Sequence, residues 1–211
     1  MNDLKIETER LILRPIEMAD FPRWAEFMAD GDTARFLGGT QTPAAAWRGF
    51  MTMAGAWHLT GVSMFSVVEK SSGLWVGRLG PWAPLDWPGT EVGWGLHRDA
   101  WGKGYAVEGA AAAMDYAFDV LGWDDVIHSI DPDNGPSQKV AERLGSTNRG
   151  PGRLPPPLDG LTIDIWGQTR DQWKARPGPA AAGAAAPARD WSSPAAAPPS
   201  ATDDCRERWS G

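Results

Sequence analysis

The most regular hydrophobic pattern in the chain lies between Gly104 and Leu121. Apolar residues recur there at three- and four-residue spacing, which places them on one face of an α-helix. The residues of this face are Val107, Ala110, Ala111, Met114, Ala117, Phe118 and Leu121. The pattern predicts one long helix, and we expect the glycine that follows it, Gly122, to form its C-cap.

Three further helices are indicated by start and stop signals. The first two open on a capping residue, Asp20 and Thr42, and Thr42 precedes a proline, which is favoured at the first helical position. A glycine at position 145 is expected to end the third helix. The ranges that we expect for these helices are 20–28, 42–59 and 136–144.

Six short segments have the composition and alternation of β-strands. They are Arg10–Arg14, Ser63–Glu69, Leu74–Trp82, Thr90–His97, Asp125–Ile130 and Leu161–Gln168. A hairpin-type connection at 70–73 joins the second and third of them. The early strands are therefore expected to pair antiparallel, whereas helices separate the later ones. This order predicts an α+β fold of three layers, with helices on both faces of one central sheet.

The composition changes sharply near Pro177. The 35 residues from there to Gly211 include 6 Pro and 11 Ala and show no sustained apolar period. Such a segment cannot bury enough apolar surface to offset the entropy of ordering it. We therefore expect one folded domain over residues 1–176 and a disordered tail over residues 177–211.

Charge and cysteine content narrow the class of protein. A net charge of -7 and a pI of about 4.9 argue against nonspecific nucleic-acid binding, which needs a positive surface. No apolar run approaches the length of a membrane span, and the N-terminus shows no cleavable signal pattern. The single cysteine, Cys205, forms no intramolecular disulfide and no thiolate metal site. A cytoplasmic location without a membrane partner is expected, and both a monomer and a homodimer are compatible with the sequence.

The segment that indicates chemistry runs from Glu91 to Glu108 and reads EVGWGLHRDAWGKGYAVE. A predicted strand ends there, and Gly102-Lys103-Gly104 opens the long helix. Backbone N–H groups at a helix N-terminus lack intrahelical partners and favour an anion. Glycines let a phosphate approach the backbone, but the spacing matches neither the dinucleotide motif nor the P-loop. Alone, the segment fits a phosphate site and a simple strand-to-helix turn equally well.

A second segment, Asp131 to Gly145, reads DPDNGPSQKVAERLG and places an Asn turn before a helix. Together the two segments resemble the GNAT acetyltransferases, in the branch that includes the ribosomal-protein N-terminal acetyltransferases. The family's acetyl-CoA signature, Gln/Arg-x-x-Gly-x-Gly/Ala, matches Trp101, Gly104 and Ala106, with a tryptophan in the first position. The resemblance covers about residues 5–175, from ETERLILRP to Ile165-Trp166-Gly167.

The resemblance implies a fold, a cosubstrate and a set of binding residues. The sheet would be mixed, mostly antiparallel and splayed between its fourth and fifth strands, with acetyl-CoA in the gap. The backbone of Gly102, Lys103, Gly104, Tyr105 and Ala106 would hold the pyrophosphate. The main chain of Trp94, Leu96 and His97 would pair with the pantetheine arm, and Asn134 and Ser137 would lie near the arm and the sulfur. The acetyl group would pass directly to an amine acceptor, without an acyl-enzyme and without a metal.

The candidate catalytic residues are Glu91 and Ser137. Glu91 lies on the strand that enters the splay and could take a proton from the acceptor ammonium, although an exposed strand residue paired with a cation would look the same. His58 and His97 are the other candidate bases. Many family members protonate the thiolate with a tyrosine at the position of Ala141, so this task would fall to Ser137 or to water.

The acceptor is not fixed by these motifs, and three functions are compatible with them. The first is acetylation of a small amine, which the aromatic residues of the first two helices favour slightly. The second is acetylation of a protein N-terminus, as the branch resemblance suggests. The third is a CoA-binding regulatory module without catalysis, because the usual tyrosine is absent.

Overall fold

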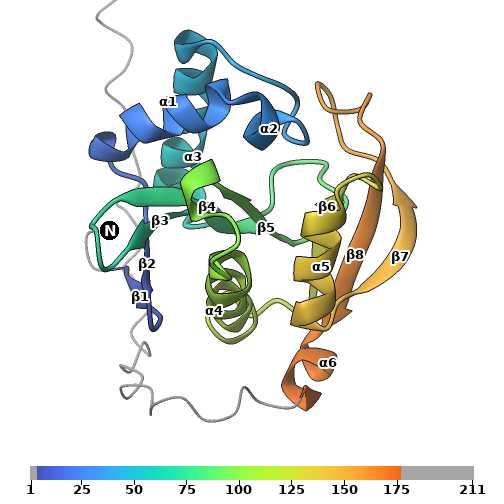
Figure 1. Ribbon diagram of the computed structural model, residues 1–211. Coiled ribbons are helices and arrows are strands. Elements are labelled where there is room, and N and C mark those ends of the chain that lie inside the picture. The colour runs from blue at the N-terminus through green and yellow to red at the C-terminus, as the bar shows by residue number, and fades with distance from the viewer. Residues whose placement is uncertain (1–3, 177–211) are drawn as a thin grey trace, which may run out of the picture. The chain divides into compact units, whose positions relative to one another are not determined.

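The computed structural model describes residues 4–176, and the predicted tail over residues 177–211 lies outside this range. Within it, eight strands form one sheet in the order β1-β2-β3-β4-β5-β6-β8-β7 (Figure 1). Their bounds are β1 Ile6–Glu7, β2 Leu11–Arg14, β3 Phe65–Glu69, β4 Trp75–Trp82, β5 Glu91–Leu96, β6 Asp125–Ile130, β7 Thr147–Gly152 and β8 Ile163–Thr169. All neighbours pair antiparallel except β5 and β6, which are parallel. The mixed, mostly antiparallel sheet expected from the sequence is confirmed.

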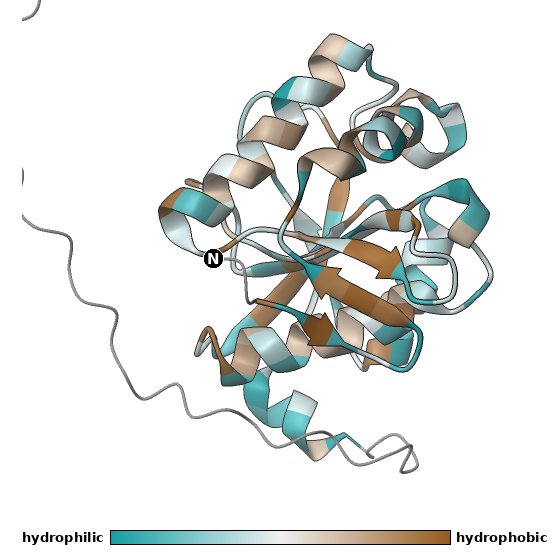
Figure 2. Cartoon of the chain, turned by 90° about the vertical axis from the view of Figure 1, so that its left-hand side faces the viewer, coloured by the Kyte–Doolittle hydropathy of each residue, from teal (hydrophilic) through white to brown (hydrophobic). Residues whose placement is uncertain are grey.

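The helices lie on both faces of this sheet, as predicted (Figure 1). They are α1 Phe21–Ala29, α2 Gly31–Ala34, α3 Pro43–Thr60, α4 Tyr105–Asp119, α5 Gly135–Leu144 and α6 Arg170–Ala175, with short 3-10 turns η1 at Met18–Asp20 and η2 at Arg98–Ala100. Helices α1 and α3 pack on one face and α4 and α5 on the other, and Figure 2 shows largely hydrophobic strands between them. No helix of the described range is long and apolar enough to cross a membrane.

Four elements were not predicted from the sequence: β1, α2, β7 and α6. Strand β7 is largely exposed and carries glycine and proline, so it lacks the alternation that marks a half-buried strand. Helix α6 follows β8, the strand predicted at Leu161–Gln168, and is the last element of the described range. A capping box formed by Thr169 and Gln172 opens this helix, and buried Trp173 attaches it to α4 by donating to Asp115 at 2.8 Å.

Two of the predicted helix caps behave differently from expectation. Helix α4 ends at Asp119 with Val120 as its C-cap, so the prediction of Gly122 as the cap was wrong; Gly122 lies in the turn that follows. Asp20 does occupy the N-cap position of α1, but its side chain does not cap that helix. Thr42, in contrast, caps α3 as expected by accepting a hydrogen bond from the N–H of Ala45.

The carboxylate of Asp20 is buried and joins three other groups. Arg14 donates to its two oxygens at 2.7 and 2.8 Å, the Ser66 hydroxyl donates at 2.6 Å, and the Glu17 N–H donates at 3.0 Å. These contacts hold the start of α1 against β2 and β3, which fixes where the first helix lies on the sheet.

Removing this carboxylate is expected to destabilise the fold strongly. In an Asp20→Ala variant the Arg14 guanidinium loses its paired charge in a partly buried place, which costs about 3 kcal/mol. An Asp119→Ala variant removes a largely exposed carboxylate from a surface pair with Lys174 and should cost under about 1 kcal/mol. Urea unfolding of both variants measures the difference, and similar losses in the two would contradict this role of Asp20.

The strands β5 and β6 diverge after a single paired position. Glu91 is opposite Ile127, whereas β4 and β5 pair over six positions from Gly77–Leu96 to Trp82–Glu91. Beyond Glu91 the edge of β5 therefore faces a gap instead of a neighbouring backbone. This is the splay that was expected between the fourth and fifth strands; these are β5 and β6 here because the short β1 precedes them.

Candidate active site

The loop between β5 and α4 has the geometry of an anion site. Gly102 and Gly104 have φ angles of +73° and +81°, which favour glycine strongly. The first helical N–H with an intrahelical acceptor is that of Glu108, which donates to the Gly104 carbonyl. Within residues 4–176, the N–H groups from Gly102 to Val107 donate to no other group. They are therefore free to bind a negatively charged ligand beside the positive end of the helix dipole.

Arg10 holds this loop from outside. Its guanidinium donates to the Lys103 carbonyl at 2.9 Å and pairs with Glu108 at 2.6 Å. The side chain of Lys103 points to Glu69, at 3.4 Å, and Tyr105 donates to the same carboxylate at 2.5 Å. Arg10 thus binds the Lys103 carbonyl of the loop, and Glu69 binds the Lys103 side chain.

A cleft of about 640 Å³ extends from this loop along the splay. The predicted residues that line it are Trp94, Leu96, Gly102, Gly104, Tyr105, Ala106, Asn134 and Ser137. Arg35 and Arg143 also line it and were not predicted; they supply positive charge that suits a phosphorylated ligand. The structure thus brings eight of the ten predicted binding residues to one cleft, and leaves His97 and Lys103 outside its lining.

The backbone of β5 explains the different place of His97. Successive residues of a strand direct their N–H and C=O groups to alternate edges. The His97 N–H donates to Val76 on β4, at 2.9 Å, so Leu96 and Trp94 direct their backbone groups to the opposite edge, toward the splay. The Leu96 carbonyl accepts a hydrogen bond at 2.8 Å from the indole of Trp101, which is half-exposed.

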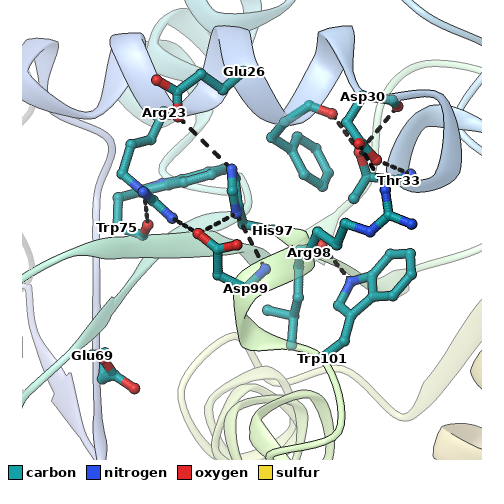
Figure 3. A network of polar contacts seen from close by, with 12 residues as sticks. Arg23, Glu26, Asp30, Thr33, Glu69, Trp75, His97, Arg98, Asp99 and Trp101 are labelled. Atoms are coloured by element: carbon teal, nitrogen blue, oxygen red, sulfur yellow. Dashed lines mark hydrogen bonds and ion pairs between the residues drawn. The ribbon is translucent and has the colours of Figure 1, made fainter.

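The ring of His97 belongs to a polar network that links helix α1 to the loop (Figure 3). It lies 3.8 Å from Glu26 and 3.3 Å from Asp99, and Arg23 bonds both Asp99 and the Trp75 carbonyl. Next to it, Arg98 pairs with Asp30 and Asp32 around helix α2. His97 is therefore a structural connection between layers, and the other candidate histidine, His58, lies exposed at the end of α3 outside both cavities.

A second cavity of about 230 Å³ adjoins the first. Trp94, Asn134 and Ser137 line both cavities, so the two share a wall at the splay. Its other walls are mostly aromatic and aliphatic, and its polar lining includes Glu91 and Arg78. Its lining includes three further aromatic residues and a methionine: Phe36, Trp82, Trp87 and Met53.

Glu91 is buried, with 6% of its surface exposed, and it is not the exposed strand residue of the alternative interpretation. Its Oε2 accepts hydrogen bonds from the Trp87 indole at 2.6 Å and from the Ser129 hydroxyl at 2.8 Å. Its Oε1 lies over Gly93, 3.0 Å from where a Cβ of that residue would be. Burial raises the pKa of this carboxyl, and the hydrogen bonds from Trp87 and Ser129 oppose the rise. A buried carboxylate with a raised pKa beside a cavity suits proton transfer.

Ser137 lies at the first turn of α5 between the two cavities. Its backbone N–H donates to the Asn134 side chain at 3.2 Å, which makes Asn134 the N-cap of the helix. Its hydroxyl accepts a hydrogen bond from the Trp94 indole at 3.3 Å. Because the hydroxyl is an acceptor there, its own proton remains available to a third group.

His128 on β6 bridges the splay and is buried. It is 1% exposed, and its ring lies 4.8 Å from that of Trp94. Nδ1 contacts the Val92 carbonyl at 2.7 Å and Nε2 contacts the Ser146 hydroxyl at 2.9 Å. Since a carbonyl only accepts, Nδ1 carries the proton of the neutral ring. A side chain thus replaces the backbone bonds that the diverging strands cannot form.

This arrangement predicts a pH dependence of stability. Burial, the larger cause, lowers the pKa of His128 to about 4 from an ordinary value of 6.5. Between these values the unfolded chain binds a proton that the folded chain does not, so stability should fall by about 3 kcal/mol as the pH decreases from 6.5 to 4. Glu91 acts in the opposite sense, because its raised pKa favours the folded state at low pH.

Urea unfolding from pH 7 to pH 4 measures this dependence. A His128→Gln variant should be less stable at pH 7. Its free energy of unfolding should also depend less steeply on pH, because the contribution of His128 is gone. A His58→Gln variant is the matched control, because His58 is exposed, and should keep the wild-type slope. An unchanged slope in His128→Gln would contradict the assignment.

Sequence reasoning missed Arg78, Ser129 and the role of Trp87. Trp87 lies four residues before Glu91 in an irregular loop, and no periodicity indicates that its indole turns back to the carboxylate. Ser129 comes from β6 and meets Glu91 only because the two strands are neighbours. Arg78 left a signal, since it is a charged residue inside an otherwise apolar strand.

Comparison with known proteins identifies the family. A model of the acetyltransferase (GNAT) domain matches residues 10–147. The uncharacterized N-acetyltransferase p20 of Bacillus licheniformis is 28% identical over 163 residues, which span 75% of this chain and 91% of that protein. An acetyltransferase structure from Agrobacterium tumefaciens is 32% identical with a TM-score of 0.69, and covers 79% of this chain and 95% of its own.

A third protein shares the fold at lower identity. The ribosomal-protein-S5-alanine acetyltransferase of Vibrio fischeri is 19% identical with a TM-score of 0.65, over 81% of this chain and 99% of its own. The matching domain model, the relatives and the splayed sheet with its glycine loop before α4 agree. The chain belongs to the GNAT acetyltransferase family and is an acyl-CoA N-acyltransferase.

Proposed function

We propose that the chain transfers the acetyl group of acetyl-CoA to the primary amine of a small molecule. The wall that two cavities share carries this proposal: Trp94, Asn134 and Ser137 line both the 640 Å³ cleft and the 230 Å³ cavity. The larger cleft begins at free backbone N–H groups and suits an elongated phosphorylated cosubstrate. The smaller cavity holds a buried carboxylate and suits an amine. Reactants bound on the two sides of this wall would meet at the splay.

In this proposal the backbone N–H groups from Gly102 to Ala106 bind the pyrophosphate. The gap-facing backbone of Trp94 and Leu96 pairs with the pantetheine arm, and a free N–H near Leu96 polarises the thioester carbonyl. The contribution of Lys103 comes from its backbone, because its side chain is paired with Glu69. His97 is left out of the cosubstrate contacts, because its N–H already bonds to Val76.

Glu91 acts as the general base. It takes one proton from the acceptor ammonium, and the nitrogen lone pair then attacks the acetyl carbonyl carbon. The new C–N bond forms as the C–S bond breaks, the second proton of the nitrogen passes to the leaving thiolate, and Glu91 releases the first proton to solvent. The thiolate of CoA leaves with the bond electrons and is protonated through the Ser137 hydroxyl or through water. Family membership favours this catalytic function over a CoA-binding module without turnover.

Acetylation of a protein N-terminus is the second candidate, and an acceptor screen separates the two. Thiol release from acetyl-CoA is measured with free amines and amino acids and, in parallel, with peptides that have a free N-terminus. N-terminally blocked peptides without lysine serve as the blank. We expect turnover of small amines; faster turnover of peptides would support the second candidate, and no thiol release with any acceptor would overturn both.

A further inference from the structure

Arg78 on β4 has a guanidinium whose donors are largely unpaired among residues 4–176. Its Nε is buried and has no hydrogen-bond partner in the described part of the chain, and its Nη1 contacts only the Met64 sulfur, at 2.7 Å. Its guanidinium lies 5.4 Å from the centre of the Trp24 ring. Within residues 4–176 it forms no ion pair. A guanidinium shielded from water is ordinarily paired with a carboxylate or a phosphate.

Arg78 and Glu91 line the same cavity of about 230 Å³. They lie on one face of the sheet. Arg78 and Trp82 are four positions apart on β4 and therefore share a face, and Trp82 is opposite Glu91. The end of Met64 lies between them: its methyl is 2.6 Å from where a Gly93 Cβ would be, and Glu91 Oε1 is 3.0 Å from the same point. The two opposite charges therefore share a small cavity without pairing with each other.

The remaining walls of this cavity are mostly apolar; the polar residues among them are His128, Ser129, Asp131, Asn134 and Ser137. Trp82, Trp87 and Met53 line it together with leucines of the loop that follows β7. A ligand that pairs with both charged residues and fills the apolar part of the cavity needs an ammonium beside Glu91, an anion beside Arg78 and an apolar body. A planar carboxylate fits the fork of donors that a guanidinium presents.

We propose that the acceptor is an amino carboxylate: a small molecule with an apolar or aromatic body, whose amine lies against Glu91 and whose free carboxylate pairs with Arg78. This inference rests on the proposed function, and it narrows the acceptor within it. The amine nitrogen forms the bond to the acetyl carbon while the thioester C–S bond breaks, and the carboxylate takes no part in the reaction. The product is an N-acetylated carboxylate that has lost its ammonium charge and therefore its attraction to Glu91.

Matched pairs of acceptors test this proposal. Leucine, phenylalanine and tryptophan are compared with their primary amides, in which the carboxylate alone is neutralised, by thiol release at saturating acetyl-CoA. We expect the wild type to prefer at least one amino acid over its amide by about 100-fold in kcat/KM, because the amide leaves the guanidinium unpaired.

Variants of Arg78 assign the preference to this residue. Arg78→Met should raise the KM for the amino acid by about 100-fold and leave the amide unchanged, and Arg78→Lys should retain part of the preference. Arg48→Met is the control, because Arg48 is exposed on α3 and outside both cavities. Thermal unfolding of each variant shows whether the fold is kept, and Arg78→Lys provides the comparison if Arg78→Met is destabilised.

Failure of the carboxylate proposal can be distinguished from failure of the proposed function. Equal turnover of each amino acid and its amide, or turnover of plain amines alone, would overturn the carboxylate proposal and leave the transferase function standing. An amino acid preference that persists in Arg78→Met would also overturn it. If no amine of any class releases thiol, the proposed function fails together with this inference.

Discussion

A Gly104→Glu variant is expected to bind acetyl-CoA at least about 100-fold more weakly than the wild type, a loss of about 2.7 kcal/mol. The new carboxylate would lie at the N-terminus of α4, beside the free N–H groups that are proposed to hold the pyrophosphate, and would repel it. The added Cβ would also lie 3.5 Å from Arg10 Nη2, so the carboxylate can draw Arg10 away from the Lys103 carbonyl. Titration calorimetry with acetyl-CoA measures this loss.

Two controls separate charge from backbone strain in this experiment. Gly104→Ala places a Cβ at the same φ of +81° without a charge and should weaken binding much less. Gly122→Glu places a glutamate at a similar φ of +73°, with open space around it, in the turn after the same helix, and should leave affinity unchanged. If Gly104→Glu binds acetyl-CoA as the wild type does, the loop is only a turn.

A Glu91→Gln variant is expected to lose about 100- to 1,000-fold in kcat/KM for the acceptor at neutral pH, the usual contribution of a general base. Glutamine keeps an oxygen that can accept from Trp87 and Ser129, so the local fold should survive. Acetyl-CoA affinity should change by less than about twofold, because Glu91 lines the second cavity and not the first. Steady-state kinetics with a thiol readout and calorimetry measure the two quantities.

The pH profile identifies the role of this carboxylate more sharply. Since burial raises the pKa of Glu91, wild-type activity should decline toward low pH as the carboxylate becomes protonated. The Glu91→Gln variant should lack this decline. The difference in kcat/KM between the wild type and Glu91→Gln should become smaller at high pH, where solvent deprotonates the amine. Glu142→Gln, which changes an exposed carboxylate on α5, should match the wild type. A loss below about fivefold in Glu91→Gln would exclude it as the base.

Local sequence patterns predicted most of the elements that form the core. Helices α3, α4 and α5 and the strands from β2 to β6 carry a period or a cap that only a few neighbouring residues determine. Strand β7 and helix α2 were missed because one is exposed and the other has only four residues, so neither shows a full period. The incorrect assignment of Gly122 as a C-cap has a similar origin, because a glycine near a helix end is identified by its residue type alone.

Some parts of the candidate site could likewise be predicted from local sequence, whereas others could not. The loop from Gly102 to Ala106 could be predicted because its binding groups are backbone N–H groups of consecutive residues at a helix start. Arg78, Trp87 and Ser129 meet Glu91 from two neighbouring strands and a loop, and only strand register brings them together. Whether Glu91 was an exposed ion-pair partner or a buried carboxylate was likewise decided by packing.

The sequence by itself therefore determined the family, the order of the core elements and the glycine loop at the start of α4, because these depend on contacts between residues that are close in the chain. Only the tertiary structure decided which backbone groups of β5 face the splay, that His128 bridges it, and that Arg78 and Glu91 share one cavity without pairing. These features depend on register, on the direction of side chains across strands and on the exclusion of water. Each is set by residues distant in sequence, so none has a local pattern from which it could have been predicted.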